Sequence, residues 1–164
     1  MHRQGLEGLL ASRFNRDAEI YGIEIGCFKA DLSCHLFSKF LNLQITTIDP
    51  YVQWSEVIEK TKEYSHRLQI IPLMSDVAHN LLSIKYDFIF IDGDHSYEQC
   101  KKDILNYQKL LKDGGLLAGH NYHKSPCREN GNSSADSAHP GVHHAVDEIF
   151  GDRVKLAPDF IWYV

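Results

Sequence analysis

The segment 86–98, YDFIFIDGDHSYE, constrains the fold more than any other part of the chain. Phe88–Ile91 is a short, fully apolar run, which is typical of a strand buried on both faces of a parallel sheet. The run ends abruptly at Asp92-Gly93-Asp94-His95, directly before a helix start. Ligands of open α/β sheets bind beyond the carboxyl ends of the strands. Two carboxylates and an imidazole at that position therefore predict a chemical site rather than core packing.

Strands and helices alternate along the rest of the chain. Apolar runs predict strands over 20–25, 45–48, 68–73, 88–91 and 116–118, and helical periodicity predicts helices over 6–14, 31–41, 55–65, 77–82, 97–111 and 141–150. Residues 112–115 (KDGG) predict a helix stop, and 154–164 a terminal hairpin. This order predicts an α/β, doubly wound, mostly parallel sheet with helices on both faces. We expect one domain over 1–164, with an N-terminal helix within 1–19 and a long polar loop over 121–140.

Composition limits the classes of partner. The chain has 164 residues, a formal net charge of −5 and 43% hydrophobic residues, which suffices for one domain with a sizeable core. No basic field attracts nucleic acid or an anionic membrane, and no apolar stretch approaches the roughly 20 residues of a membrane span. We expect a cytoplasmic protein, with a homodimer left open. The cysteines show no metal-ligand spacing and are expected as reduced thiols: Cys27, Cys34, Cys100 and Cys127.

The turn after the first strand is a candidate ligand loop. Gly26 follows the strand directly, and a glycine there lets the backbone turn sharply and approach a ligand closely. Ala30 is small enough to serve a similar clearance. The chain has neither G-x-G-x-x-G nor G-x-x-x-x-G-K-[ST], so an ordinary strand-to-helix turn is the alternative.

Acidic residues follow the second and third strands as well. Asp49 is placed to accept hydrogen bonds from both hydroxyls of a ribose, and the alternative is a helix cap or an Asp-Pro turn. Ser75 and Asp76 are helix-cap candidates that are also placed to bond the edge of an adenine. The two roles of this pair are compatible.

Taken together, these motifs resemble the class I S-adenosylmethionine-dependent methyltransferases, in the small-molecule O-methyltransferase branch. The resemblance covers about residues 20–150 and includes the later segments GGLLAGHNY and PGV-x-x-AV. It implies a Rossmann-like methyltransferase fold with a seven-stranded sheet. Ala30 stands where the family has a second glycine. The resemblance implies that cofactor binding falls to Glu24, Gly26, Phe28, Ala30, Asp49, Ser75, Asp76 and Asp92.

The resemblance also implies candidates for catalysis. Metal-assisted members place an aspartate after the fourth strand and a pair of ligands after the fifth, where this chain has Asp92 and His120-Asn121. These residues are the predicted ligands of a divalent Mg, Mn or Zn ion, and the alternative is that Asp92 only binds the cofactor amine. His95 falls where catechol-type enzymes have a general-base lysine. An imidazole can accept a hydroxyl proton at neutral pH.

The leading functional hypothesis is methyl transfer from S-adenosylmethionine to a hydroxyl of a small molecule, such as a sugar or a polyol. One alternative is a non-catalytic cofactor-binding module or partner subunit. Another is a metal hydrolase built on the histidine-rich stretch 120–144, although its spacing matches no familiar zinc site. We instead expect the loop 121–140 to cover the acceptor pocket.

Overall fold

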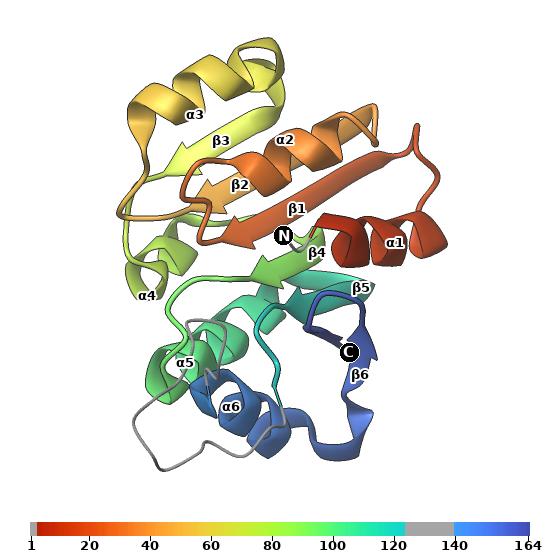
Figure 1. Cartoon of the computed structure of the whole chain (residues 1–164), viewed down its shortest axis with the longest axis vertical. Helices are drawn as coiled ribbons and strands as arrows, with labels where there is room; N and C mark the ends of the chain where they lie inside the picture. Colours follow the sequence, from red (N-terminus) through yellow and green to blue (C-terminus); the bar gives the residue numbers. More distant parts are fainter. Residues whose placement is uncertain (1–2, 124–139) are drawn as a thin grey trace.

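The computed structural model describes residues 3–123 and 140–164 and contains a seven-stranded sheet with the order β3-β2-β1-β4-β5-β7-β6 (Figure 1). Neighbouring strands from β3 to β5 are parallel, whereas β7 runs antiparallel to both β5 and β6. The predicted α/β sheet and its terminal hairpin are confirmed. The strands are β1 (Glu19–Ile25), β2 (Asn42–Ile48), β3 (Leu68–Ile71), β4 (Tyr86–Ile91), β5 (Leu111–Gly119), β6 (Lys155–Ala157) and β7 (Ile161–Tyr163).

Helices cover both faces of this sheet. The α-helices are α1 (Arg3–Arg13), α2 (Asp31–Phe37), α3 (Trp54–Thr61), α4 (Ser75–Ala78), α5 (Tyr97–Tyr107) and α6 (Pro140–Phe150). The 3-10 helices are η1 (Lys62–Arg67), η2 (His79–Leu81), η3 (Gln108–Leu110) and η4 (Gly151–Arg153). Apolar side chains of α1 and α2 pack in one core cluster, and those of α5 and α6 pack in another on the opposite side. None of the helices within 3–123 and 140–164 is long and apolar enough to cross a membrane.

The order of the strands reverses between β1 and β4. From β1 the chain proceeds outward to β2 and β3, and then returns to the other side of β1 as β4 and β5 (Figure 1). In open α/β sheets, a crevice forms at such a switch point, outside the carboxyl ends of the strands. Gly26 and Asp92 directly follow the two strands on either side of this point.

The predicted helix stop at Lys112–Gly115 is wrong. The helix α5 already ends at Tyr107, and η3 leads directly into β5. Tyr86 pairs with Leu111 and Phe88 with Leu116, so Lys112–Gly115 form an insertion in β5 opposite a single residue of β4. Gly114 has a φ of 75° within this insertion. Gly114 therefore allows an irregularity in the strand. This irregularity needs a residue in the left-handed conformation, as the end of a helix often does.

Candidate functional site

Two neighbouring cavities open at the carboxyl ends of the strands. The larger has a volume of about 790 Å³ and the smaller about 460 Å³. Gly26, Phe28, Asp92 and His95 line both of them. The larger cavity also includes the loop after β2 and the start of α4, whereas the smaller includes the end of β5. Residues predicted from three separate strand ends thus meet in one place.

Gly26 brings the ends of β1 and β4 into close approach. Its φ is 87°, and a Cβ at this position would overlap the Asp92 carbonyl oxygen and lie 2.9 Å from Gly93 Cα. The backbone continues the sheet on both sides, because Gly26 N donates to Ile48 O at 2.9 Å and Asp92 N to Ile25 O at 2.8 Å. Only glycine fits here, both for its conformation and for its lack of a side chain.

Three residues with side chains adopt the left-handed conformation in the described parts of the loops that follow β1 and β5. They are Phe28, Ala30 and Asn121, with φ values of 46°, 55° and 61°. This conformation costs roughly 1–2 kcal/mol per residue and is often retained at functional sites. Ala30 is fully buried, precedes α2 and lines neither cavity. The methyl group of Ala30, where the family has a second glycine, therefore takes no space from either cavity.

Asp49 lies in the wall of the larger cavity and also organises the loops around it. Its Oδ2 accepts a hydrogen bond from Phe28 N and its Oδ1 one from Tyr51 N, both at 2.7 Å. The second of these is the local turn that the sequence left open as an alternative. Each carboxylate oxygen has two lone pairs, so both can still accept a hydroxyl. The turn and the predicted ribose contact are therefore compatible.

Glu24 is a buried carboxyl group at the end of β1 and lines the smaller cavity. Ser33 Oγ donates a hydrogen bond to its Oε2. Burial, together with the nearby carboxylates of Asp92, Asp49 and Asp31, raises the pKa of Glu24 to about 8, against the lowering effect of the Ser33 hydrogen bond. At neutral pH the group is mostly protonated, and a cationic ligand nearby would favour its ionised form.

We expect Glu24→Gln to make the free energy of unfolding less dependent on pH. Because the folded-state pKa of Glu24 is raised from 4.5 to about 8, its contribution to stability is complete below pH 4.5 and is lost as the pH rises to 8. Glutamine stays neutral and still accepts from Ser33. Urea unfolding at pH 5, 6.5 and 8 should show the variant more stable than wild type at pH 8 by about 2–4 kcal/mol. Identical pH dependence in the two proteins would contradict this assignment.

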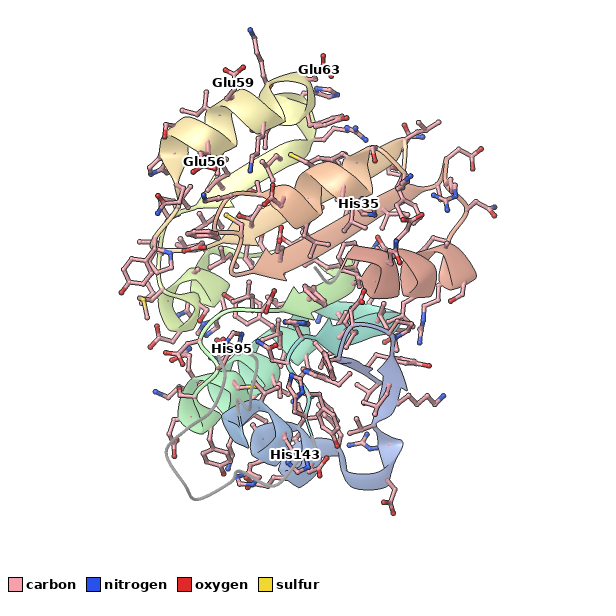
Figure 2. The ribbon with its side chains drawn as sticks, viewed as in Figure 1. His35, Glu56, Glu59, Glu63, His95 and His143 are labelled. Atoms are coloured by element: carbon pink, nitrogen blue, oxygen red, sulfur yellow. The ribbon has the colours of Figure 1, made fainter. Side chains whose placement is uncertain are left out.

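His95 lies in the turn between β4 and α5 (Figure 2). Its Nε2 lies 3.4 Å from Asp92 Oδ1 and 2.9 Å from Asn121 Nδ2. His120 Nδ1 lies 3.2 Å from the same Asp92 oxygen. If the side-chain amide of Asn121 is turned over, its oxygen takes the place of its nitrogen. Asn121 is therefore suited either to donate a hydrogen bond to His95 or to accept one from it. The structure thus brings together two imidazoles, a carboxylate and an amide.

The predicted metal site is not supported. Among residues 3–123 and 140–164, no group of three or more His, Cys, Asp or Glu side chains is arranged to hold a metal ion. In the histidine-rich stretch, His143 Nε2 is 2.9 Å from Asp147 Oδ2, and Tyr122 donates to the other oxygen of that carboxylate. His139 and most of the predicted loop 121–140 lie outside the described residues.

The third strand leads to the far end of the larger cavity. The capping prediction there is wrong, because α4 begins at Ser75, Met74 is its N-cap residue and no side chain caps it. Ser75 lines the cavity, whereas Asp76 is exposed and lines neither cavity. Sequence reasoning missed Met74 and Gln99, which line the same end. No signal marks them, since Met74 resembles an ordinary loop residue and Gln99 an ordinary residue of a first helical turn.

Comparison with known proteins agrees with this geometry. Residues 23–122 match a family model described as a methyltransferase domain. An uncharacterized protein of Acanthamoeba polyphaga mimivirus is 28% identical over 139 residues, which are 74% of this chain and 59% of that protein. The chain therefore spans about three fifths of the length of this curated relative.

Two solved structures share the fold. A candidate caffeoyl-CoA O-methyltransferase from Staphylococcus aureus superposes with a TM-score of 0.74 at 19% identity, over 96% of this chain and 78% of that one. A SAM-dependent methyltransferase from Thiobacillus denitrificans, in complex with S-adenosyl-L-homocysteine, superposes with a TM-score of 0.58 at 16% identity, over 75% and 51% of the two chains. At these identities the likeness concerns the fold alone.

Proposed function

We propose that this chain, which belongs to the methyltransferase domain family and has the class I fold, transfers a methyl group from S-adenosylmethionine to a hydroxyl of a small molecule. One observation supports this proposal above the others. Gly26, Asp49 and Asp92, which follow three different strands, line a single cavity at the switch point of the sheet. A ligand with a diol and a cationic centre would find a partner at each of these strand ends.

The residues present fit this cofactor. The volume of about 790 Å³ lies in the range of small-molecule sites. Asp49 keeps lone pairs for the ribose hydroxyls, and Glu24 with Asp92 offers carboxyl groups to the amine of the methionine moiety. Gly26 leaves space where a side chain would meet the backbone of Asp92 and Gly93, directly after β4. When bound, S-adenosylmethionine supplies an electrophilic methyl group.

His95 is the residue that would take the proton of the acceptor hydroxyl. It lines both cavities, so an acceptor in the smaller one reaches the imidazole next to the cofactor site. Asp92 Oδ1 lies 3.4 Å from His95 Nε2, and Asn121 restrains the orientation of the ring. Holding the hydroxyl close to the methyl donor supplies much of the remaining rate enhancement.

The smaller cavity supports a hydroxyl-rich acceptor such as a sugar or a polyol. Apart from Glu24 and Asp92, which face the amine of the cofactor, it is lined by the carboxyl group of Asp31 and by the imidazoles of His95 and His120. Carboxylates accept hydrogen bonds from hydroxyl groups, and imidazoles either donate or accept them. A volume of about 460 Å³ suits an acceptor of modest size.

We expect Asp49→Ala to weaken binding of S-adenosylhomocysteine about 10- to 100-fold, because the variant loses the acceptors of the ribose hydroxyls and frees two backbone amides. Calorimetric titration measures this effect. Asp113→Ala removes an exposed carboxylate in the β5 insertion and should bind like wild type. Equal affinities of wild type and Asp49→Ala would contradict the assignment.

Turnover tests the chemical step. Wild-type protein is incubated with S-adenosylmethionine and a panel of sugars, polyols and phenols, and formation of S-adenosylhomocysteine is measured. We expect turnover with at least one hydroxylated acceptor. Binding of S-adenosylhomocysteine without turnover on any acceptor would favour a non-catalytic cofactor-binding module.

A further inference from the structure

A buried carboxylate lies beneath the far end of the larger cavity. Asp103 is fully buried on α5, and its Oδ1 accepts hydrogen bonds from Ser75 Oγ at 2.6 Å and from Gln99 Nε2 at 3.0 Å. Its Oδ2 has no hydrogen-bond partner within the described part of the chain. A Cβ on Gly93, a residue of the cavity wall, would lie 4.0 Å from this Oδ2.

This carboxylate fixes the direction of each neighbouring hydrogen bond. Burial raises the pKa of Asp103 to about 6, so at pH 8 the group is ionised and only accepts. Gln99 must then present its amino group, which donates to Asp103 Oδ1 and, at 3.0 Å, to Ser75 Oγ. The Ser75 hydroxyl hydrogen is committed to Asp103 as well. The Gln99 carbonyl oxygen and a lone pair on Ser75 Oγ remain, and both are acceptors.

This end of the cavity is suited to a purine. Ser75 and Gln99 lie here, together with the apolar surfaces of Met74 and Ile48. His120 and Asn121, which belong to the predicted acceptor side, line only the smaller cavity. A cofactor with its methyl group near His95 would therefore extend its base toward Ser75.

We propose that Asp103 is a positioning residue that makes this site select a purine with an exocyclic amino group over one with a carbonyl at the same position. The inference rests on the proposed function, since it concerns the base of the same cofactor. An exocyclic amino group can donate hydrogen bonds to the Gln99 carbonyl oxygen and to the remaining lone pair of Ser75 Oγ. A 6-oxo purine directs an oxygen at them instead, and a site built for a donor rejects a ligand that lacks it.

The test compares S-adenosylhomocysteine with S-inosylhomocysteine by calorimetric titration at pH 8. Wild type should bind the adenosyl ligand at least about 10-fold more tightly. In Asp103→Asn the amide can donate or accept, so Gln99 can turn its amino group toward the base. We expect the inosyl ligand to bind about 10-fold more tightly than in wild type, and the adenosyl ligand to stay within about 3-fold. Damage to the structure would instead weaken both.

Two further variants complete the experiment. Gln99→Met keeps the length of the side chain without its carbonyl and should weaken the adenosyl ligand about 10-fold. Glu98→Gln removes an exposed charge from the same helix and should keep the wild-type ratio. The inference would be overturned if Asp103→Asn kept the wild-type ratio of the affinities for the adenosyl and inosyl ligands, or if it weakened the binding of both ligands equally. Equal binding of both ligands by wild type would overturn it as well. Failure of wild type to bind either ligand would overturn the proposed function itself.

Discussion

Gly26→Ala is expected to abolish detectable binding of S-adenosylhomocysteine and to destabilise the fold by about 3–5 kcal/mol. The positive φ accounts for roughly 1–2 kcal/mol of this cost. The rest arises because the new methyl group would overlap the Asp92 carbonyl, so the ends of β1 and β4 must separate. Calorimetric titration and urea unfolding measure the two effects.

Gly114→Ala is the matched control for this variant. Gly114 also has a positive φ, of 75°, but a Cβ there would meet no atom within 4 Å. Gly114→Ala should lower the free energy of unfolding only by the roughly 1–2 kcal/mol of the backbone conformation, and it should leave the binding of S-adenosylhomocysteine unchanged. If both variants lost the same stability and both still bound the ligand, the close approach of β1 and β4 would not be the feature that shapes the site.

His95→Gln is expected to lower the turnover number about 10²- to 10⁴-fold while changing the affinity for S-adenosylhomocysteine less than about 3-fold. Glutamine keeps hydrogen bonding toward Asp92 and Asn121 but does not accept a proton near neutral pH. Single-turnover methyl transfer, measured with the acceptor identified from the panel, gives the chemical step directly.

His66→Gln serves as the control for His95→Gln. His66 is an exposed histidine on η1, which precedes β3 and so lies away from the carboxyl ends of the strands. It should turn over like wild type. Equal rates in wild type and His95→Gln would show that another group, or solvent, takes the proton.

Local sequence patterns predict most of the fold. The apolar run before Asp92 predicts a buried parallel strand, and β4 is that strand. An uninterrupted apolar run of this length is typical of a strand that is covered on both faces. The KDGG segment shows where such patterns fail. A glycine with positive φ serves a helix end or a strand bulge equally well, and only the pairing of β5 with β4 decides between them.

The site was predictable only in part. Residues directly after strands, such as Gly26, Asp49 and Asp92, converge because parallel strands bring their carboxyl ends to one edge. Ser33, Gln99 and Asp103 lie within helices, where their sequence neighbours say nothing of the cavity. Their contacts with Glu24 and Ser75 depend on how α2 and α5 pack on the sheet, which the local sequence does not encode.

A crystal structure of the wild-type protein with S-adenosylhomocysteine tests most directly whether the carboxyl ends of β1, β2 and β4 hold the cofactor. We expect the ribose hydroxyls against Asp49, the amine of the homocysteine moiety facing Glu24 and Asp92, and the purine beside Ser75 and Gln99. A ligand bound elsewhere on the sheet, or an electron density map without the ligand at saturating concentration, would contradict the account.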